Sequence, residues 1–376
     1  MIVNGLGIGE YDLPPQIPAI NSFKDVNKKI KMNLPNLSSM GLLKIADEPL
    51  YNKPENLFIY GKLKKQNNGK NIIYDYMEFF GNTHTGPLIN LIHGVPENFL
   101  KKIEKKVGLQ FIGNIHTEHS KAIDEFGDKH IKTGKPILYL SNDNSLHVAA
   151  NTNIITKERL YEICEIVASE LKINFGIDKV TARPFGGTPG YFYRMYEKKE
   201  FLYKPKEKML ISKLAKKTKV ILLSNLSELF IHIKNCSRVL SPTDEVTLHQ
   251  LNKIFDMKFN GVVFAGLTNL YKYGKQSDLI AYAHELEKID SFIGHTMEKI
   301  NENDIFFVVG NHGCCPISKG NESGHEYVPF LSYRKNNKKT VHLKTVEYSY
   351  IIKGLLDYHN IKNYPDNMLS QYIISN

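Results

Sequence analysis

The chain has 376 residues, enough for one large core or for two domains of ordinary size. Its 42% hydrophobic and 23% charged residues are typical of a globular protein, and its formal net charge of +10 favours anionic partners such as phosphates. Lysine is spread along the whole sequence and no nucleic-acid-binding motif occurs, so small phosphates are favoured over nucleic acid.

The N-terminal part of the chain begins with an apolar strand at residues 1–10 that breaks into the glycine-rich sequence GLGIG. The pattern is not a complete GxGxxG motif and no helix clearly follows it. We therefore interpret it as a tight turn after the first strand and not as a nucleotide-binding loop. Residues 14–56 are rich in Pro, Asn and Lys and are predicted to be loop with short elements, and residues 57–62 are predicted to be a strand.

The middle of the chain mixes strands with helices. Residues 157–172 are predicted to form a helix, because apolar side chains recur there on one face. Short apolar runs predict strands at residues 111–113, 137–141 and 180–183, and the glycine-rich run at 185–190 predicts a loop. The whole stretch spans about 110 residues, which is the size of an inserted domain.

From residue 205 onward, helices and strands alternate regularly. The longest helix is predicted at residues 276–300, where apolar side chains recur at helical spacing. The other elements predicted here are helices at 209–216, 246–255 and 348–357 and strands at 219–223, 261–267 and 305–309. Repeated βα units predict a parallel sheet that is covered on both faces, and we expect the first strand of the chain to join it.

Together these elements predict an α/β fold: a doubly wound parallel-sheet core with an inserted α+β cap. The core domain is predicted to be discontinuous, formed by residues 1–95 and 205–376, and the cap domain by residues 96–204.

A candidate site loop follows the strand predicted at residues 305–309. The strand leads into Asn311, His312 and Gly313, and polar groups at the carboxyl ends of α/β strands face the crevice where such folds bind ligands. The cysteines Cys314 and Cys315 would suit a soft metal. No second cysteine or histidine pair completes four ligands, so we interpret them as buried thiols.

The spacing of the four cysteines does not form a disulfide framework, which favours a reducing compartment. No N-terminal signal segment is evident, and no run approaches the roughly 18 apolar residues of a membrane span. We expect a cytoplasmic protein that binds neither membrane nor nucleic acid.

Blocks of sequence along nearly the whole chain carry a family resemblance. They are GLGIG at residues 5–9, PNLSSMGL at 35–42, IGN at 112–114, HIKTGKPILYLSNDNSLHVAAN at 130–151, LYEICEIV at 160–167, ARPFGGTPGYFYR at 182–194, YGKQSD at 273–278, NHGCCP at 311–316 and HEYVP at 325–329. These blocks resemble phosphopentomutase, of the alkaline phosphatase superfamily. The resemblance implies an alkaline phosphatase-like core with a cap. It also implies transfer of a phosphoryl group between C1 and C5 of ribose or deoxyribose, with two manganese ions, a phosphorylated Thr and a bisphosphate activator.

The catalytic positions of that family are mostly replaced in this chain. Carried over residue by residue, the metal-binding aspartates fall on Asn4, Leu270 and Asn311, the metal-binding histidines on Lys275, His312 and Ser323, and the phosphorylated Thr on Ile73. Two neighbouring divalent cations need anionic oxygen ligands to offset their repulsion, and these positions do not supply them. We therefore expect no catalytic residue, no metal ligand set and no cofactor, although manganese belongs to the family.

Other positions of the resemblance keep residues that suit a sugar phosphate. Asp143, Arg183 and Arg194 match the family's sugar-phosphate-binding segments, where arginine holds a phosphate and Asp143 would accept a ribose hydroxyl. A loop-capping aspartate and arginines that tie strands together are the equally weighted alternative. Lys275 is expected to hold an anion without a metal, and His312 completes the candidate substrate-binding set.

The preferred interpretation is a phosphopentomutase-like protein without mutase activity, which binds a phosphorylated sugar or a protein partner. One alternative is an enzyme with altered, metal-independent chemistry that uses His312, Lys275 or Cys315. The other is a still active phosphopentomutase that interconverts ribose 1-phosphate and ribose 5-phosphate.

Overall fold

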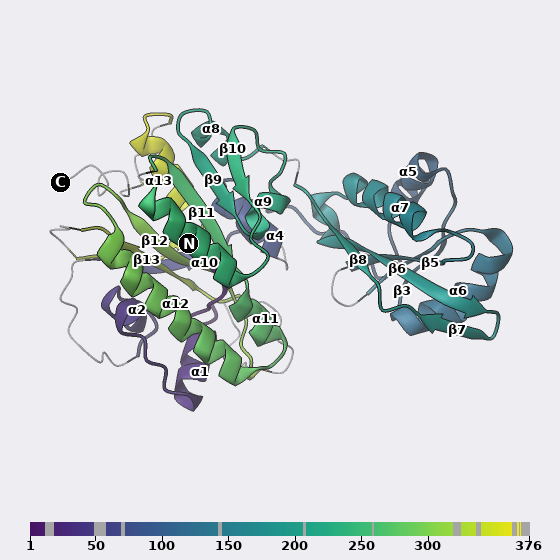
Figure 1. Cartoon of the computed structure of the whole chain (residues 1–376), viewed down its shortest axis with the longest axis horizontal. Helices are drawn as coiled ribbons and strands as arrows, with labels where there is room; N and C mark the ends of the chain where they lie inside the picture. Colours follow the sequence, from purple (N-terminus) through teal and green to yellow (C-terminus); the bar gives the residue numbers. More distant parts are fainter. Residues whose placement is uncertain are drawn as a thin grey trace. The chain divides into compact units, whose positions relative to one another are not determined.

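The computed structural model describes residues 1–11, 19–48, 58–68, 72–141, 145–205, 208–257, 259–318, 325–335, 340–362, 367 and 369. The chain divides into two compact units: unit 1 is Met1–Thr85 with Lys206–Asn376, and unit 2 is Gly86–Pro205 (Figure 1). Unit 2 thus begins before residue 96, where the cap domain was predicted to start. The intervening segment bonds within unit 2, since the backbone N–H of Ile89 donates to Asn174 O at 2.8 Å and that of Val95 to Asn114 Oδ1 at 2.8 Å.

The sheet of unit 1 is parallel at its centre and antiparallel toward one edge. Its order is β10-β9-β11-β1-β12-β13-β2-β14, with β15 also paired to β2. The strands are β10 Cys236–Val239, β9 Val220–Leu223, β11 Val262–Leu267, β1 Ile2–Gly5, β12 Phe306–Gly313, β13 Val328–Tyr333, β2 Ile59–Lys64, β14 Val341–His342 and β15 Val346–Glu347. The first strand lies at the centre and pairs in parallel with both β11 and β12. The α/β class with a parallel-sheet core is therefore confirmed.

β12 is longer than the strand predicted at residues 305–309. It continues through Asn311 and His312 to Gly313, because Gly5 at the end of β1 pairs with Gly313. The predicted site residues therefore lie within the strand end and not in a loop after it, and strand pairing fixes their backbone.

Helices cover both faces of this sheet. They are α1 Ser22–Lys29, α2 Pro35–Ser39, α3 Leu42–Ile45, α4 Ile72–Phe79, α8 Ile211–Leu214, α9 Asn225–Leu229, α10 Asp244–Asp256, α11 Asn269–Lys275, α12 Leu279–Lys299 and α13 Tyr350–Tyr358. Val3 packs in the core shared with α12, whereas the next residue, Asn4, bonds to Tyr76 of α4. Successive side chains of a strand point to opposite faces, so α4 lies on the face opposite α12.

α12 forms where the sequence predicted the longest helix. Asp278 caps its start by accepting a hydrogen bond from the backbone N–H of Ala281 at 3.0 Å. Tyr282, Leu286 and Ile293 are fully buried at helical spacing. The apolar stripe against the sheet therefore stabilises this helix, as its sequence periodicity indicated.

Unit 2 has its own six-stranded sheet, ordered β3-β4-β5-β6-β7, with β8 paired to β6. Its elements are β3 Ile112–His116, β4 Ile137–Leu140, β5 Ser145–Asn151, β6 Lys179–Thr188, β7 Tyr191–Arg194, β8 Lys199–Leu202, α5 Glu97–Val107, α6 His119–Thr133, α7 Lys157–Glu170 and the 3-10 turn Ile173–Phe175. The loop predicted at residues 185–190 is wrong for most of its length. β6 continues to Thr188, because its glycine-rich end pairs with β7 in a hairpin.

No helix in the described ranges of either unit is long and apolar enough to serve as a membrane span. The cytoplasmic location expected from the sequence stays a prediction.

Candidate functional site

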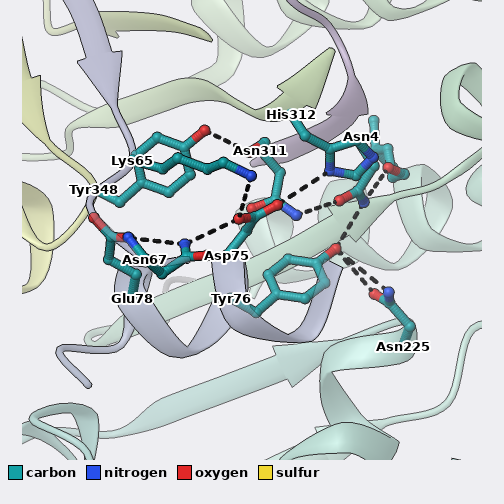
Figure 2. Close-up of polar contacts among 11 residues, drawn as sticks. Asn4, Lys65, Asn67, Asp75, Tyr76, Glu78, Asn225, Asn311, His312 and Tyr348 are labelled. Carbon is teal, nitrogen blue, oxygen red and sulfur yellow. Dashed lines mark hydrogen bonds and ion pairs between the residues drawn. The ribbon is translucent and has the colours of Figure 1, made fainter. Parts of the chain in front are cut away.

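Five polar side chains meet where the carboxyl ends of the parallel strands of the unit 1 sheet lie. They are Asn4 in β1, Lys65 just after β2, Asp75 in the first turn of α4, and Asn311 and His312 at the end of β12. β2 and β12 are both antiparallel to β13, so both strands end at this edge. Each of the five is at most 6% exposed. We call this group the strand-edge cluster (Figure 2).

Asn4 and Asn311 form a direct amide–amide pair. Asn311 Nδ2 donates to Asn4 Oδ1 at 2.8 Å. Asn4 Nδ2 donates in turn to the Tyr76 hydroxyl at 2.7 Å and to Leu267 O at 2.6 Å (Figure 2). A carboxylate has no hydrogen to donate, so the bond that Asn4 makes to the Leu267 carbonyl oxygen requires an amide at this position. Asn4 is thereby committed to neighbouring groups of the protein.

Lys65 and Asp75 form a buried ion pair. Lys65 Nζ lies 3.8 Å from Asp75 Oδ1, and the two side chains are 4% and 2% exposed. Asn67 Nδ2 donates to the same oxygen at 3.1 Å, and Glu78 holds the loop by accepting from the backbone N–H groups of Gln66 and Asn67 at 3.0 Å. Burial raises the pKa of Asp75, while Lys65 and Asn67 oppose that rise.

His312 makes no hydrogen bond through either ring nitrogen to the residues that the structure describes. Its Nδ1 lies 3.7 Å from Asp75 Oδ2, and the ring of Tyr271 packs edge-on against it, with centroids 4.8 Å apart. Burial, together with the charges of Lys65 and Lys275, lowers the pKa of His312 to about 3. The imidazole is therefore neutral at physiological pH, and one of its nitrogens, set by the tautomer, has a lone pair available for a ligand bond.

Glu326, just before β13, forms hydrogen bonds that hold the N-terminal glycine turn in place. Its carboxyl group accepts from Ser22 N at 2.8 Å and from Gly9 N at 3.3 Å. A side chain at Gly7 or Gly313 would collide with the Glu326 carboxyl group. Gly7 of GLGIG thus leaves room for a buried side chain of the same protein, which agrees with the tight-turn interpretation.

Glu326 is expected to make stability fall as pH rises from about 4.5 to about 7. Burial raises its pKa to about 7 from the ordinary 4.5. Within this window the carboxyl group is protonated in the folded chain and ionised in the unfolded chain. The loss reaches about 3 kcal/mol, at roughly 1.4 kcal/mol per pKa unit.

This effect is measured by urea unfolding at several pH values between about pH 4 and about pH 8, spaced roughly one pH unit apart. Glu326→Gln stays neutral, so its free energy of unfolding relative to the unmodified chain should improve with rising pH. The exposed Glu298→Gln is the control. A constant difference between Glu326→Gln and the unmodified chain across this range would contradict the assignment.

A second polar group lies in unit 2, where three rings stack. Tyr139 lies between His119 and His147, with ring centroids 5.9 Å and 4.9 Å away and near-parallel planes. The Tyr139 hydroxyl bonds to His119 Nδ1 at 2.6 Å. Arg183 Nε donates to His147 Nδ1 at 3.2 Å, so His147 Nε2 carries the hydrogen that Ser141 Oγ accepts at 2.6 Å. Both stacked histidines thus have defined partners.

Arg183 in β6 and Arg194 in β7 bring positive charge to this stack. Burial, together with the nearby Arg183, Arg194 and His147, lowers the pKa of His119 to about 3. In the described part of the chain neither arginine forms an ion pair with a carboxylate, whereas Arg159 is paired with Glu162. Guanidinium groups without carboxylate partners are suited to bind an anion.

The predicted site residues fall into two groups. Arg183 and Arg194 lie near one ring in unit 2. Lys275 and His312 lie close enough in unit 1 for the ammonium to lower the pKa of the imidazole. Asp143 lies outside the described residues, so its proposed contact with a ribose hydroxyl stays a prediction.

The other positions carried over from the resemblance have different surroundings. Leu270 is 1% exposed within the apolar core, and Ile73 is 2% exposed in α4. Lys275 is exposed at the end of α11. Ser323 lies outside the described residues.

Sequence reasoning missed Lys65 and Asp75 in unit 1 and the stacked rings in unit 2. One signal was available: Asp75 and Glu78 stand in the otherwise apolar run IIYDYMEFF at residues 72–80, and a carboxylate in an apolar run requires a partner when it is buried. Nothing in the sequence indicated that Lys65 would be that partner, because the order of the strands places it there.

The chain is similar to a family model and to several known proteins. The Metalloenzyme superfamily model matches residues 206–362. The phosphopentomutase of Clostridium acetobutylicum is 30% identical over 344 residues, which cover 88% of this chain and 86% of that protein. The phosphopentomutase of Dictyoglomus turgidum is 29% identical, covering 96% of this chain and 94% of that protein. Among solved structures, the alkaline phosphatase of the Antarctic bacterium TAB5 is 11% identical, covers 96% of this chain and 97% of its own, and has a TM-score of 0.39.

The parallel-sheet core occurs together with a match to the Metalloenzyme superfamily model over residues 206–362, so this part of the chain is similar to that class of protein. Within that class, the identity shared along most of its length shows that the chain belongs to the phosphopentomutase family.

The expectation of no cofactor is wrong, because the matched model describes a superfamily of metalloenzymes. The strand-edge cluster nevertheless does not fit the family's two-ion centre: Asn4 is committed to other groups and Leu270 offers no donor. The described residues contain no group of three or more His, Cys, Asp and Glu suited to a metal. Within the strand-edge cluster, the His312 ring nitrogens and Asn311 Oδ1 have no hydrogen-bond partner among the described residues.

Proposed function

We propose that this chain binds a phosphorylated pentose through unit 2 and does not carry out the mutase reaction of its family. The observation that carries the binding part is the pair Arg183 and Arg194 near His119, without carboxylate partners in the described part of the chain. The names of the relatives support the substrate class, since phosphopentomutases act on phosphorylated pentoses.

The arrangement in unit 2 suits a phosphate group. Arginine offers paired donors that match phosphate oxygens, and a charge-assisted hydrogen bond contributes about 1.5–3 kcal/mol. Arg183 Nε is fixed by His147, which leaves the terminal nitrogens of its guanidinium group for the ligand. Asp143 is proposed, on the resemblance alone, to accept a ribose hydroxyl.

Two features support the loss of mutase chemistry. The position of the phosphorylated Thr is occupied by Ile73, which has no hydroxyl and is 2% exposed. The amide pair Asn4–Asn311 stands where the resemblance places metal-binding carboxylates. A two-ion mechanism needs anionic ligands at such positions to hold both cations.

The alternative of metal-independent chemistry has two of its three candidate residues buried. Cys315 is 3% exposed, and burial raises the pKa of its thiol, which disfavours the reactive thiolate. His312 is 2% exposed. Lys275 is exposed, and we assign it the role of holding an anion near His312.

Titration calorimetry of the full chain with ribose 5-phosphate tests the binding part. Arg183→Ala and Arg194→Ala are each expected to weaken binding by about tenfold or more, since each removes a charge-assisted contact. Arg159→Ala, which removes an arginine already paired with Glu162, should leave the affinity unchanged.

Equal affinity of the unmodified chain and both unit 2 variants would overturn the binding part, as would a failure of the unmodified chain to bind. Equal affinity of Lys275→Ala and the unmodified chain for inorganic phosphate would overturn the role given to Lys275 in unit 1. Steady turnover of ribose 5-phosphate to ribose 1-phosphate, with manganese and a bisphosphate activator, would overturn the loss of mutase activity.

A further inference from the structure

Three polar atoms in the strand-edge cluster are buried without a hydrogen-bond partner in the described residues: both ring nitrogens of His312 and Oδ1 of Asn311. His312 is 2% exposed and Asn311 is fully buried. Buried polar atoms without partners are costly, so such a concentration at one place points to a bound species.

The carboxylate of Asp75 lies beside these atoms, which indicates that the bound species is positively charged. Asp75 Oδ2 faces His312 Nδ1 at 3.7 Å. This separation exceeds the roughly 3.2 Å limit of a good hydrogen bond. It fits two ligand atoms that each lie about 2.1 Å from a shared metal ion.

We infer that His312, Asp75 and Asn311 hold one divalent transition-metal ion. The set supplies an imidazole nitrogen, a carboxylate oxygen and an amide oxygen, and such mixed nitrogen–oxygen sites suit Zn²⁺ and Mn²⁺. Asp75 comes from α4 and stands at no position where the resemblance places a metal ligand. The chain therefore replaces a lost ligand set with one carboxylate from a different element.

Lys65 competes with this ion for the negative charge of Asp75. Its ammonium lies 3.8 Å from Asp75 Oδ1, on the carboxylate that also serves the ion. Without a metal, Lys65 balances the charge of Asp75. With a metal, the two positive charges repel each other at short range. The site should therefore bind its ion more weakly than its ligands alone would allow, and removal of Lys65 should tighten binding.

Metal titration of the full chain, stripped with a chelator and then dialysed, tests this inference. ZnCl₂ binding is followed by calorimetry, and MnCl₂ binding by the loss of the free Mn²⁺ signal in electron paramagnetic resonance. One equivalent is expected to bind. Asp75→Asn and His312→Gln should each weaken binding by about tenfold or more. Loss of a residue that only orients a metal ligand already costs about that factor, and these two residues are proposed as the ligands themselves.

The charge variants give the sharper contrast. Lys65→Met should tighten binding by about tenfold or more, because a positive charge about 4 Å away is removed. Lys62→Met is the matched control: it removes a lysine of the same strand that pairs with the exposed Asp47 at 3.8 Å, and it should leave the affinity unchanged. Circular dichroism confirms that each variant is folded. His312→Gln decides the test where Asp75→Asn does not fold.

Three results would overturn the inference. They are no binding to either the unmodified chain or Lys65→Met, equal binding to the folded ligand variants and the unmodified chain, and two equivalents bound in place of one. The first of these would assign the unpartnered atoms to ordered water. None of these outcomes bears on the binding of sugar phosphate in unit 2, because all ligands proposed here belong to unit 1.

Discussion

Asn4→Asp is expected to lower the free energy of unfolding by about 3 kcal/mol at pH 7, because it buries a charge without a counter-charge and breaks the hydrogen bond to Leu267 O. Asn4 is fully buried, and its amide nitrogen donates to Leu267 O at 2.6 Å and to the Tyr76 hydroxyl at 2.7 Å. The new carboxylate would place an oxygen against the Leu267 carbonyl oxygen. Urea unfolding in the presence of a chelator measures the loss.

The matched control for this substitution is Asn153→Asp, which makes the same change at an exposed position of unit 2. Its stability should remain within about 0.5 kcal/mol of the unmodified chain. A loss below about 1 kcal/mol for Asn4→Asp would contradict the account, because Asn311 and Tyr76 supply neutral hydrogen-bond donors and no counter-charge for a buried carboxylate.

Lys65→Met is expected to lower the free energy of unfolding by about 3 kcal/mol at pH 7, since it leaves the buried Asp75 without its counter-charge. The loss should shrink at low pH. Burial raises the pKa of Asp75 in the folded chain, and removing Lys65 raises it further. Asp75 is then protonated in the folded chain at pH values where the unfolded chain is ionised, so stability falls as pH rises above the ordinary pKa.

A double-mutant cycle with Asp75→Asn measures the coupling between the two side chains. The double variant should be more stable at pH 7 than Lys65→Met alone, because it no longer buries a charge. Equal stability of Lys65→Met and the double variant, or a loss that does not depend on pH, would show that the two residues are not coupled.

The elements predicted well are those with strong local patterns. α12 was predicted because its apolar face repeats at helical spacing, and the central strands because they are short apolar runs. α4 was missed because the run IIYDYMEFF is apolar on most sides and shows no clear stripe: seven of its eight helical residues are buried. The antiparallel pairing of β13 and β2 depends on long-range contacts that no local pattern encodes.

The candidate site was predicted in part. The strand-end rule and the family resemblance together indicated Asn4, Asn311 and His312, and the structure joins the two amides through a hydrogen bond. Lys65 and Asp75 were not predicted, because they reach the edge through the pairing order of β2 and through α4.

The error about the cofactor has a physical explanation. Loss of ligands at inherited positions shows that the inherited site has changed, but it does not show which other side chains the fold brings there. In this chain Asp75 belongs to α4, a helix in which no ligand was expected, and its Oδ2 lies 3.7 Å from His312 Nδ1.

Anomalous X-ray scattering from crystals grown with MnCl₂ and without chelators tests most directly whether the two-ion centre has been lost. We predict a single manganese peak, bounded by His312, Asp75 and Asn311, and no peak between Asn4 and Leu270. Two peaks a few ångströms apart, one of them between Asn4 and Leu270, would contradict this conclusion.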